Sequence, residues 1–321
     1  MSTYLVTGGA GFIGSNIVEQ LLNQNQHVRV LDNFSTGKRE NIELLKKNFI
    51  DKKNEKALTR LEIIEGDIRS YHIVRDAVDK VDFILHQAAL PSVPRSVKDP
   101  LTTNEVNVVG TLNILNAGKE AKVKRIVYAS SSSVYGDLEV MPKTEDMLPK
   151  PLSPYAVSKL AGEKYCQVFT KLYGLETVAL RYFNVFGPRQ DPTSQYSAVI
   201  PKFITLIREG KSPIIYGNGE QSRDFTYVDN VVQANLLACQ DGLENLSGEV
   251  FNAAYGKRVT INELVNSINK LLGTDVKPTY ADPRPGDILH SLSNIGKARQ
   301  FLGYEPKVDF YGGLKKLVFG D

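Results

Sequence analysis

The sequence predicts an α/β fold, with a Rossmann-type doubly wound parallel sheet and a smaller C-terminal α/β lobe. Strand-like apolar runs alternate with helical patterns through the first half of the chain, and this alternation is typical of parallel sheets with right-handed crossovers. The first strand runs into closely spaced glycines, and the second strand ends on an acid. We expect residues 1–183 to form the sheet domain and residues 184–321 mainly the second lobe, from which some strands and helices return to the first domain.

The strands expected in the sheet are short and rich in aliphatic and β-branched residues, which favour pleated, buried positions. They are Tyr4–Thr7, Val28–Leu31, Leu61–Glu65, Phe83–His86, Arg125–Ala129 and Thr177–Arg181. Residues 39–60 lie between the second and third strands and are rich in Lys, Glu and Asn. They predict a helical surface insertion without chemistry of its own.

The second half of the chain has a less regular pattern. Residues 184–197 contain Gly187 and two prolines, and we expect a loop there. The three prolines within residues 278–287 predict an extended or turning chain. The helices expected in this half are Val199–Arg208, Val228–Ala238 and Ile261–Leu271.

Composition excludes several classes of protein. Of the 321 residues, 42% are hydrophobic and 23% are charged, which is sufficient for a sizeable core. The net charge of +3 gives no broad basic surface, so we expect no nucleic-acid partner. No apolar run approaches the ~20 residues that span a bilayer, so we expect no membrane partner. The four histidines lack metal-ligand spacing, and no metal is expected.

The expected location is the cytoplasm. Cys166 and Cys239 fall in apparent helices and do not suggest a disulfide framework, which fits a reducing compartment. The first expected strand begins by residue 4, and this leaves no room for a signal peptide.

The glycines after the first strand predict a nucleotide site. Gly8, Gly11 and Gly14 are spaced three apart and lead into an amphipathic helix. Glycines let the backbone turn sharply and approach a pyrophosphate, which then meets the free N–H groups at the helix N-terminus. Glycine spacing alone is equally compatible with a plain tight turn. The strand before it and the helix after it favour a dinucleotide.

Asp32 indicates which dinucleotide is bound. It ends the second strand, 18 residues after Gly14. An acid there can accept hydrogen bonds from the adenosine ribose hydroxyls and repels a 2′-phosphate, so NAD is favoured over NADP. Lys38 and Arg39 would argue for NADP, but we interpret them as a solvated pair in a loop.

Tyr155 and Lys159 form the most informative pair in the chain. If Pro154 opens a helix, the two side chains lie one turn apart on the same face. A nearby cation favours the phenolate, so a tyrosine placed in this way can act as a base near neutral pH. Such a pair is common by chance in long helices. The serine run Ser130–Ser133 and the nucleotide fingerprint make it significant here.

A series of motifs in fixed order carries a family resemblance. They are Thr7–Gly14, Asp67-Ile68, His86–Ala89, Asn107–Thr111, Ser130–Gly136, Tyr155-x-x-x-Lys159, Arg181–Pro188 and Ser222–Asp229. Over essentially the whole chain, this series resembles the extended short-chain dehydrogenase/reductase superfamily, and within it the nucleotide-sugar 4-epimerases. More narrowly, Gln87–Ser96 and Tyr182–Pro192 are similar to the bacterial and archaeal UDP-N-acetylglucosamine 4-epimerases of polysaccharide synthesis.

The resemblance implies a mechanism and a catalytic trio. Tyr155 takes the proton of the sugar 4-hydroxyl while hydride passes from C4 to NAD, and Ser131 shares or relays that proton. Lys159 lowers the pKa of the tyrosine and holds the nicotinamide ribose. The 4-keto sugar turns over in the site and receives the hydride on its other face, so NAD returns unchanged.

The resemblance also implies the binding residues, as a set for each ligand. The cofactor residues are Gly8, Gly11, Phe12, Ile13, Gly14, Asp32, Asn33, Ser35, Thr36, Gly37, Asp67, Ile68, Gln87, Ala88, Ala89, Asn107, Tyr155, Lys159 and Tyr182. The UDP-sugar residues are Pro91, Ser92, Ser131, Ser132, Ser133, Tyr155, Asn184, Ala198, Val199, Phe203, Tyr216, Arg223, Arg284, Asp287 and Ser291.

Several of these residues have specific implied roles and open alternatives. The resemblance implies that Asp67 and Ile68 hold the adenine of the cofactor. It implies that Arg223 and Arg284 bind the diphosphate of the UDP-sugar. Asp287 would bind the uridine ribose. Each role has an alternative. Asp67 and Ile68 would only form a turn at the end of a strand, and the two arginines would be surface residues in loops. Asn107 would brace a helix turn instead of contacting the cofactor.

Three positions bear on which sugar is bound. The wall position of the family falls on Ser291, where enzymes restricted to glucose and galactose carry a large aromatic residue. Ala198 stands where those enzymes carry asparagine. Both small residues predict a pocket enlarged for an N-acetyl group. Pro91 counts the other way, because it stands where the acetylated-sugar group commonly carries a glycine, and it stiffens the loop near the sugar.

Two other functions remain as alternatives to the acetylated-sugar epimerase. UDP-glucuronate 4-epimerases share the serine run and the Arg223–Tyr227 segment. A non-catalytic NAD-binding sensor belongs to a different class and is opposed by the intact Ser131, Tyr155 and Lys159. A 4,6-dehydratase is disfavoured because the acid pair that this group needs after a Thr in the serine region is missing.

A homodimer is also expected. The helices near residues 102–119 and 155–172 carry apolar residues beyond one face, and in the resembled family they pair into a four-helix interface. The alternative is that these residues are buried within one chain.

Overall fold

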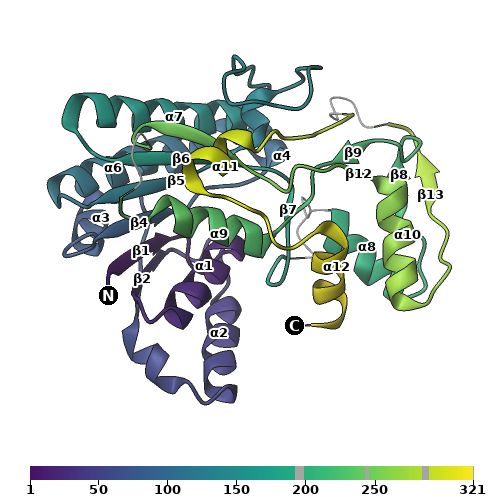
Figure 1. The fold of residues 1–321 in the computed structure, drawn as a ribbon, viewed down its shortest axis with the longest axis horizontal. Coiled ribbons are helices and arrows are strands. Elements are labelled where there is room, and N and C mark those ends of the chain that lie inside the picture. The colour runs from purple at the N-terminus through teal and green to yellow at the C-terminus, as the bar shows by residue number, and fades with distance from the viewer. Residues whose placement is uncertain (192–198, 243–245, 284–288, 321) are drawn as a thin grey trace.

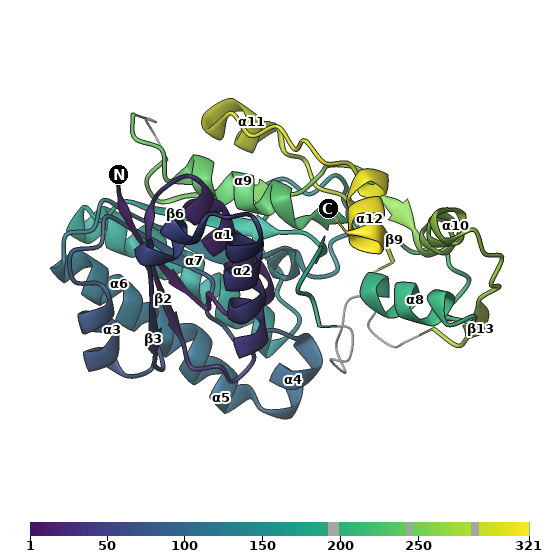
Figure 2. The same ribbon diagram turned by 90° about the horizontal axis from the view of Figure 1, so that it is seen from below.

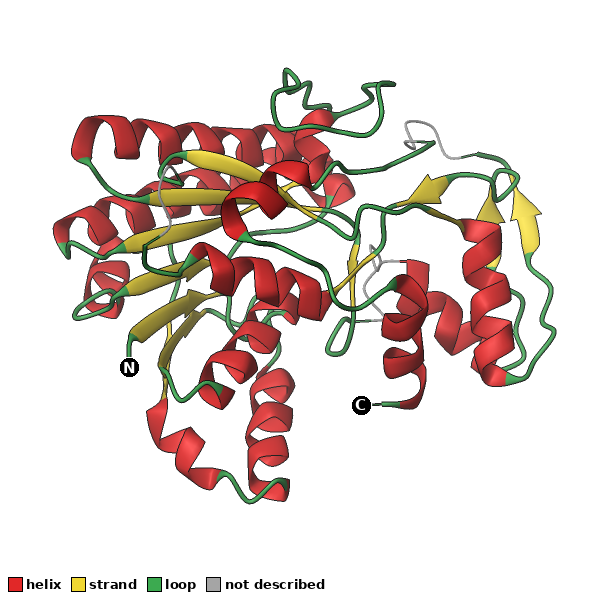
Figure 3. Cartoon of the chain, viewed as in Figure 1, coloured by secondary structure: helices red, strands yellow, loops and turns green. Residues whose placement is uncertain are grey.

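The computed structural model describes residues 1–191, 199–242, 246–283 and 289–320. Its main element is a seven-stranded sheet in which every neighbouring pair of strands is parallel, with helices on both faces (Figures 1 and 3). In order across the sheet the strands are β11 (Glu249–Ala253), β6 (Thr177–Tyr182), β5 (Arg125–Ser131), β4 (Phe83–His86), β1 (Thr3–Thr7), β2 (His27–Asp32) and β3 (Leu61–Glu65). The predicted Rossmann-type fold is confirmed.

The sheet divides the apolar core into two layers. Successive residues of a strand point to opposite faces, and Leu5 and Val6 of β1 accordingly belong to different clusters of buried side chains. Helices from both halves of the chain cover these faces (Figure 2). On one side lie α1 (Phe12–Asn23), α2 (Arg39–Asp51) and α9 (Val228–Ala238), and on the other α3 (Tyr71–Ala77), α6 (Gly110–Glu120) and α7 (Pro154–Tyr173).

Short helical segments complete the first half. They are a 3₁₀ turn at Glu55–Arg60, α4 (Val93–Lys98), α5 (Pro100–Asn104), a π-helical segment at Glu105–Val109 and a 3₁₀ turn at Ser132–Tyr135. The helix expected near residues 102–119 is therefore interrupted by the π segment, a feature that is frequent at functional sites. Within the described parts of the chain, no helix combines the length and the apolar character that a membrane crossing requires.

Residues 39–60, which we expected to form a helical surface insertion, are partly buried in the structure. Residues 39–51 do form a helix, α2, but Ile42, Leu45 and Phe49 are buried. These three residues are spaced i, i+3 and i+7, so they share one face. That face packs against α1, and α2 is therefore part of the core rather than a purely external element.

The second lobe combines helices with three two-stranded sheets. The expected helices are confirmed as α8 (Val199–Arg208), α9 and α10 (Ile261–Leu272), and α11 (Gly296–Leu302) and α12 (Phe310–Phe319) follow. The paired strands are β7 (Val185–Phe186) with β10 (Thr226–Tyr227), β8 (Ile214–Tyr216) with β13 (Thr279–Ala281), and β9 (Ser222–Arg223) with β12 (Val259–Thr260).

The strands of the second half were not expected from local sequence, and β7 and β11 show why. β7 forms within the expected loop 184–197 because it pairs with β10, which lies about forty residues later. β11 adds a seventh strand to the main sheet by pairing in parallel with β6. Both strands depend on partners that are distant in the chain.

The outer surface of α7 and the segment before α6 carries exposed apolar side chains. Val157, Val168 and Leu172 of α7 are 53%, 45% and 65% exposed, and Leu101 is 77% exposed. Exposed apolar side chains on neighbouring helices are typical of interaction sites. The homodimer therefore stays a prediction, and these side chains define the surface that it would use.

We predict that the protein is a homodimer at micromolar concentration. Sedimentation should give twice the chain mass of 35.6 kDa. Val168→Glu combined with Leu172→Glu should give the single-chain mass, because burying two carboxylates in an apolar interface is costly. Leu148→Glu is the control, since Leu148 is 85% exposed outside these helices. A single-chain mass for the unmodified protein would contradict the prediction.

Candidate functional site

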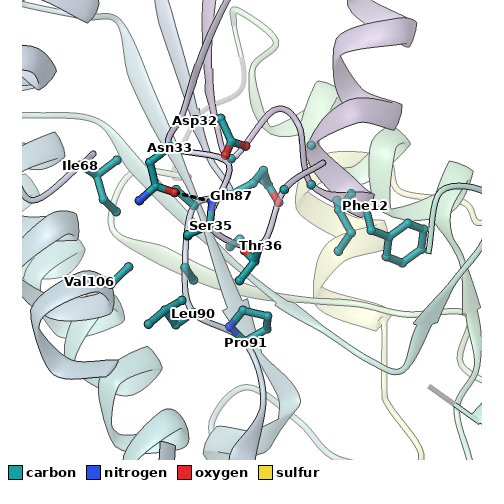
Figure 4. A pocket seen from close by; sticks show the side chains of 18 of the residues that line it. Phe12, Asp32, Asn33, Ser35, Thr36, Ile68, Gln87, Leu90, Pro91 and Val106 are labelled. Atoms are coloured by element: carbon teal, nitrogen blue, oxygen red, sulfur yellow. Dashed lines mark hydrogen bonds between the residues drawn. The ribbon is translucent and has the colours of Figure 1, made fainter. Parts of the chain in front are cut away.

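A cavity of about 790 Å³ lies at the carboxyl ends of the strands, beside β1 and β4, where the strand order reverses. Open α/β sheets bind ligands at this point. Apart from Asn107, all the predicted cofactor residues line the cavity, and Figure 4 shows several of them. These lining residues are Gly8, Gly11, Phe12, Ile13, Gly14, Asp32, Asn33, Ser35, Thr36, Gly37, Asp67, Ile68, Gln87, Ala88, Ala89, Tyr155, Lys159 and Tyr182.

The glycine loop fits a dinucleotide. Gly8 has a φ of +68°, and a Cβ there would lie 2.8 Å from the Cα of Ala88. At Gly14 a Cβ would collide with the carbonyl oxygen of Gly8. Gly11 is the N-cap of α1 and has no side chain to satisfy the first N–H groups of the helix. These N–H groups therefore face the cavity and suit a pyrophosphate.

Asp32 is held at the edge of the cavity by the backbone. Its Oδ2 accepts a hydrogen bond from the N–H of Ala10 at 2.9 Å, and its Oδ1 accepts one from the N–H of Phe34 at 2.8 Å. A Cβ at Gly37 would lie 2.8 Å from Oδ2, so a glycine is needed beside the carboxylate. Burial raises the pKa of Asp32, and the two N–H donors oppose this change.

The two cations near Asp32 are both engaged in ion pairs. Lys38 Nζ lies 2.8 Å from Asp191 Oδ2, and Arg39 Nη2 lies 2.7 Å from Glu65 Oε1. Both side chains are exposed to solvent, as expected, and each forms a salt bridge of its own.

The adenine end of the cavity is formed by the loops after β2 and β3. Asn33 donates its Nδ2–H to Asp67 Oδ2 at 2.9 Å, and Arg69 Nη2 donates to the same oxygen at 2.8 Å. The hydrogen bond with Arg69 holds the pKa of Asp67 at about 2. Ile68 and Val106 present apolar side chains on this side of the cavity (Figure 4).

The helix of the predicted catalytic pair begins as expected. Pro154 is at the first helical position of α7, and the Ser153 hydroxyl accepts the N–H of Ala156 at 3.1 Å. Tyr155 and Lys159 therefore project from the first two turns toward the cavity.

The structure brings the three predicted catalytic residues together. Lys159 is 4% exposed, and its Nζ donates a hydrogen bond to the carbonyl of Ala129 at 2.8 Å. The same nitrogen lies 5.9 Å from the ring centre of Tyr155. The hydroxyl of Ser131, at the end of β5, interacts with the phenol of Tyr155 and opposes the rise of its pKa.

Burial, rather than charge, dominates the pKa values of this group. Desolvation raises the pKa of Tyr155, and the hydrogen bond with Ser131 opposes it. Desolvation also lowers the pKa of Lys159 to about 8, while the carboxylate of Glu163 acts in the opposite direction. The expectation that the neighbouring ammonium lowers the phenol pKa thus differs from the structure, because both groups are removed from water.

Asn107 lies behind the cavity wall. Its Oδ1 accepts the N–H of Leu90 at 2.7 Å, and its Nδ2 donates to the carbonyl of Leu90 and, at 3.0 Å, to the hydroxyl of Ser158. These contacts fit the alternative in which Asn107 braces the protein structure and does not bind the cofactor directly. It ties the loop after β4 to α7.

Asn235 was missed by the sequence reasoning. This buried residue of α9 donates its Nδ2–H to the Tyr182 hydroxyl at 2.8 Å and accepts a hydrogen bond from Gln87 Nε2 at 3.0 Å. It thereby orients two side chains of the cavity wall. No local motif signals it, because α9 is separated from Gln87 by about 150 residues.

Other lining residues were also missed, and they surround the predicted motifs. They are Leu31, Phe34, Lys38, Gly66, Leu90, Arg95, Val106, Ala129, Ser130, Gln190 and Asp191. Most are chain neighbours of a predicted residue, so widening each motif by one position would have found them. Arg95 brings an additional cation to the cavity.

The predicted UDP-sugar residues of the first half lie near the cavity. Pro91 and Tyr155 line it. Ser131, Ser132 and Ser133 follow one another at the end of β5, and Ser133 Oγ is buried without a hydrogen-bond partner among the described residues. This unpaired hydroxyl fits a site for a polar ligand. Ser92 caps α4 by accepting the N–H of Arg95.

The predicted UDP-sugar residues of the second lobe that the structure describes lie outside the cavity lining. Ser291 donates its N–H to the carbonyl of Ser222 at 3.0 Å, next to Arg223, so these two predicted residues are neighbours. Asn184 follows β6, Val199 begins α8, Tyr216 ends β8 and Phe203 is buried in the core. Ala198, Arg284 and Asp287 lie outside the described residues.

We predict that the purified protein carries NAD, held chiefly by the Gly8–Gly14 loop and Asp32. Denaturation followed by chromatography should release NAD rather than NADP. Asp32→Ala should weaken NAD binding at least about tenfold, because a hydrogen bond to a charged group contributes about 1.5–3 kcal/mol. Calorimetric titration of the stripped protein measures this loss. Glu62→Ala, on the exposed side of β3, is the control. An unchanged affinity for NAD in Asp32→Ala would contradict the role of Asp32 in NAD binding.

Comparisons with known proteins agree with this site. Residues 4–254 match the model of the NAD dependent epimerase/dehydratase family. The chain is 36% identical over 315 residues to the UDP-glucose 4-epimerase of Mycolicibacterium smegmatis, covering 98% of this chain and 96% of that protein.

Two solved structures are similar over nearly their full length. The UDP-N-acetylglucosamine 4-epimerase from Methanobrevibacter ruminantium M1, in complex with UDP-N-acetylmuramic acid, has a TM-score of 0.91 and 42% identity, covering 99% of this chain and 97% of that one. The UDP-glucuronic acid 4-epimerase from Bacillus cereus, in complex with UDP-glucuronic acid and NAD, has a TM-score of 0.87 and 33% identity, covering 99% and 98%. This chain therefore belongs to the NAD dependent epimerase/dehydratase family, with NAD as its cofactor.

Proposed function

We propose that the protein is a UDP-sugar 4-epimerase whose principal substrates are UDP-N-acetylglucosamine and UDP-N-acetylgalactosamine, with UDP-glucose and UDP-galactose as further substrates. The observation that carries the proposal is the convergence of Ser131, Tyr155 and Lys159 beside a cavity that fits NAD. When bound, NAD supplies a hydride acceptor and donor.

The side chains of the trio then handle the proton. Tyr155 takes the proton of the sugar 4-hydroxyl, and the neighbouring Ser131 shares it. Lys159 is fixed by the carbonyl of Ala129, and its ammonium lies 5.9 Å from the ring centre of Tyr155. The same groups return the proton when the hydride is delivered to the opposite face.

Two observations support the acetylated sugar. The relative from Methanobrevibacter ruminantium is named for this activity and is 42% identical. In the sequence, Ser291 is small, and in the structure it lies next to Arg223, the expected diphosphate residue. A small wall residue near the diphosphate leaves room for an N-acetyl group in both ring orientations.

UDP-glucuronate remains the second candidate substrate. Arg95 lines the cavity together with Pro91, and a guanidinium there suits a sugar carboxylate. The relative from Bacillus cereus, 33% identical, carries UDP-glucuronic acid in its structure. A non-catalytic NAD sensor is opposed by the assembled trio.

The experiment is incubation of the purified protein with UDP-N-acetylglucosamine, UDP-glucose and UDP-glucuronate in separate reactions. We predict the C4 partner of the acetylated sugar as the fastest-formed product. Tyr155→Phe should lose a factor of roughly 10²–10⁴ in turnover while retaining UDP-sugar binding, because only the proton acceptor is removed. Chromatography of the products and calorimetry of binding measure the two effects.

Tyr165→Phe is the matched control, since Tyr165 lies on the same helix and is outside the cavity lining. Fastest turnover of UDP-glucuronate would replace the acetylated sugar by the second candidate. No product from any of the three sugars would favour the sensor. Near-normal turnover in Tyr155→Phe would show that another group is the base.

Ser291→Tyr tests the sugar assignment directly. A bulky side chain should prevent the N-acetyl group from fitting in one of the two orientations that epimerisation requires. We predict that turnover of UDP-N-acetylglucosamine falls by roughly 10² or more relative to that of UDP-glucose, since steric exclusion in a packed pocket costs a few kcal/mol. Steady-state rates with both sugars give the ratio.

Ser247→Tyr places the same side chain at an exposed position as a control. Equal losses for the two sugars in Ser291→Tyr would show that Ser291 is not the gatekeeper.

A further inference from the structure

We propose that Glu163 is a positioning residue of the catalytic centre, which holds the end of β5 in place for Ser131 and keeps Lys159 charged. The proposal deepens the proposed function and rests on it for the roles of Ser131 and Lys159. Glu163 does not line the cavity, and neither the sequence motifs nor the trio assigns it a role.

The carboxylate of Glu163 joins three elements of the fold. It projects from α7, four residues beyond Lys159, and its side chain is 1% exposed. Oε1 accepts hydrogen bonds from the Ser130 hydroxyl of β5 and, at 2.9 Å, from Arg181 Nε of β6. Oε2 accepts a second hydrogen bond from Arg181, from Nη2 at 2.8 Å. Both carboxylate oxygens are therefore engaged.

Strand register explains why these groups meet. Ser130 pairs with Arg181, and Ser131 pairs with Tyr182. Because side chains alternate along a strand, Ser130 and Arg181 point to the α7 face, as their contacts with Glu163 confirm. Fixing the Ser130 side chain thus fixes the backbone from which the next residue, Ser131, reaches Tyr155.

Stability alone is a weak explanation for this buried ion pair. The side chain of Arg181 is 4% exposed, its Nη1 has no hydrogen-bond partner among the described residues, and its guanidinium lies 4.6 Å from the ring centre of Tyr135. Well-packed apolar residues often replace buried ion pairs without loss of stability. The position of the pair, one helical turn from Lys159, suits a role at the catalytic centre.

The groups that surround Lys159 indicate that Glu163 stabilises its charged form. From α7 it faces Glu163 and Tyr155, and from β5 its Nζ lies 5.2 Å from the ring centre of Tyr128. From β4 it faces His86, which burial keeps neutral by lowering its pKa to about 3.

On β6, Arg181 lies behind Glu163 as the second charged group. Among the described groups around Lys159, Glu163 is the carboxylate that raises the pKa of the ammonium. It therefore opposes the lowering of that pKa by burial.

The sign of the pH effect follows from this balance. Lys159 loses its proton as the pH rises through its pKa, which burial has already lowered to about 8. Removing the negative charge of Glu163 lowers that pKa further, so the charged form is lost at lower pH. If the reaction needs the ammonium, the basic limb of the rate–pH profile moves to lower pH.

The test compares four variants of the NAD-loaded enzyme. Glu163→Gln should move the basic limb of kcat down by roughly one pH unit or more. Ser130→Ala keeps every charge and should lower kcat several-fold, with KM and the limb unchanged. Glu163→Met with Arg181→Met removes both charges without an orphaned partner and should also move the limb down.

Glu176→Gln is the matched control. It removes one partner of the Arg125–Glu176 ion pair, whose Nη2–Oε2 distance is 2.6 Å, at the opposite end of the same strands. We expect it to cost stability while leaving kcat and the basic limb unchanged. A shift of the limb in this variant would show that any lost ion pair produces the effect, and would overturn the proposal.

A readout independent of activity separates this inference from the proposed function. NMR titration of protein labelled at the lysine ε-carbon, with Lys159→Arg to identify the signal, reports the pKa of Lys159 directly. A lower value in either variant that lacks Glu163 supports the proposal even if no UDP-sugar is turned over. An unchanged value there overturns the charge role, and an unchanged kcat in Ser130→Ala overturns the positioning role.

Discussion

The site depends on the close approach of two backbone segments at the carboxyl end of the sheet. Gly8 leaves β1 with a φ of +68°, and a Cβ there would lie 2.8 Å from the Cα of Ala88, which follows β4. β1 and β4 are neighbours at the point where the strand order reverses. The loops that follow them therefore run to opposite sides of the sheet and leave the cavity between them. A side chain at position 8 would push these loops apart, so the absence of one allows the wall of the cavity to form.

Buried polar groups around this opening determine its chemistry. Asp32, Lys159 and Glu163 are nearly inaccessible to water, and each is held by specific hydrogen bonds: Asp32 by backbone N–H groups, Lys159 by a backbone carbonyl, and Glu163 by Ser130 and Arg181. Satisfying these groups limits the cost of burying them. Burial nevertheless raises the pKa of Tyr155 and lowers that of Lys159 to about 8. The reactivity of the pair is therefore a balance between desolvation and a few charges, and helical spacing alone does not describe it.

The second half of the chain also contributes to the cofactor domain. β11 extends the main sheet beside β6, and α9 packs against α1, the helix that follows the glycine loop. From α9, Asn235 reaches Tyr182 and Gln87 in the cavity wall. A change in the second lobe can thus reach the cofactor site through packed helices and hydrogen bonds. A boundary near residue 183 therefore separates two parts of the sequence, but elements from after this boundary pack within the cofactor domain.

The sequence by itself determined the six strands of the first half, the glycine loop with Asp32, and the Tyr155–Lys159 pair, because each of these depends on residues close together in the chain. Only the tertiary structure decided the position of β11, the pairing of β7 with β10, and the contacts of Asn107 and Asn235. It also decided the direction of the pKa shift of Tyr155. These features depend on partners that are distant in the sequence and on the removal of water, and neither periodicity nor motif spacing encodes which distant groups will meet or how deeply they will be buried.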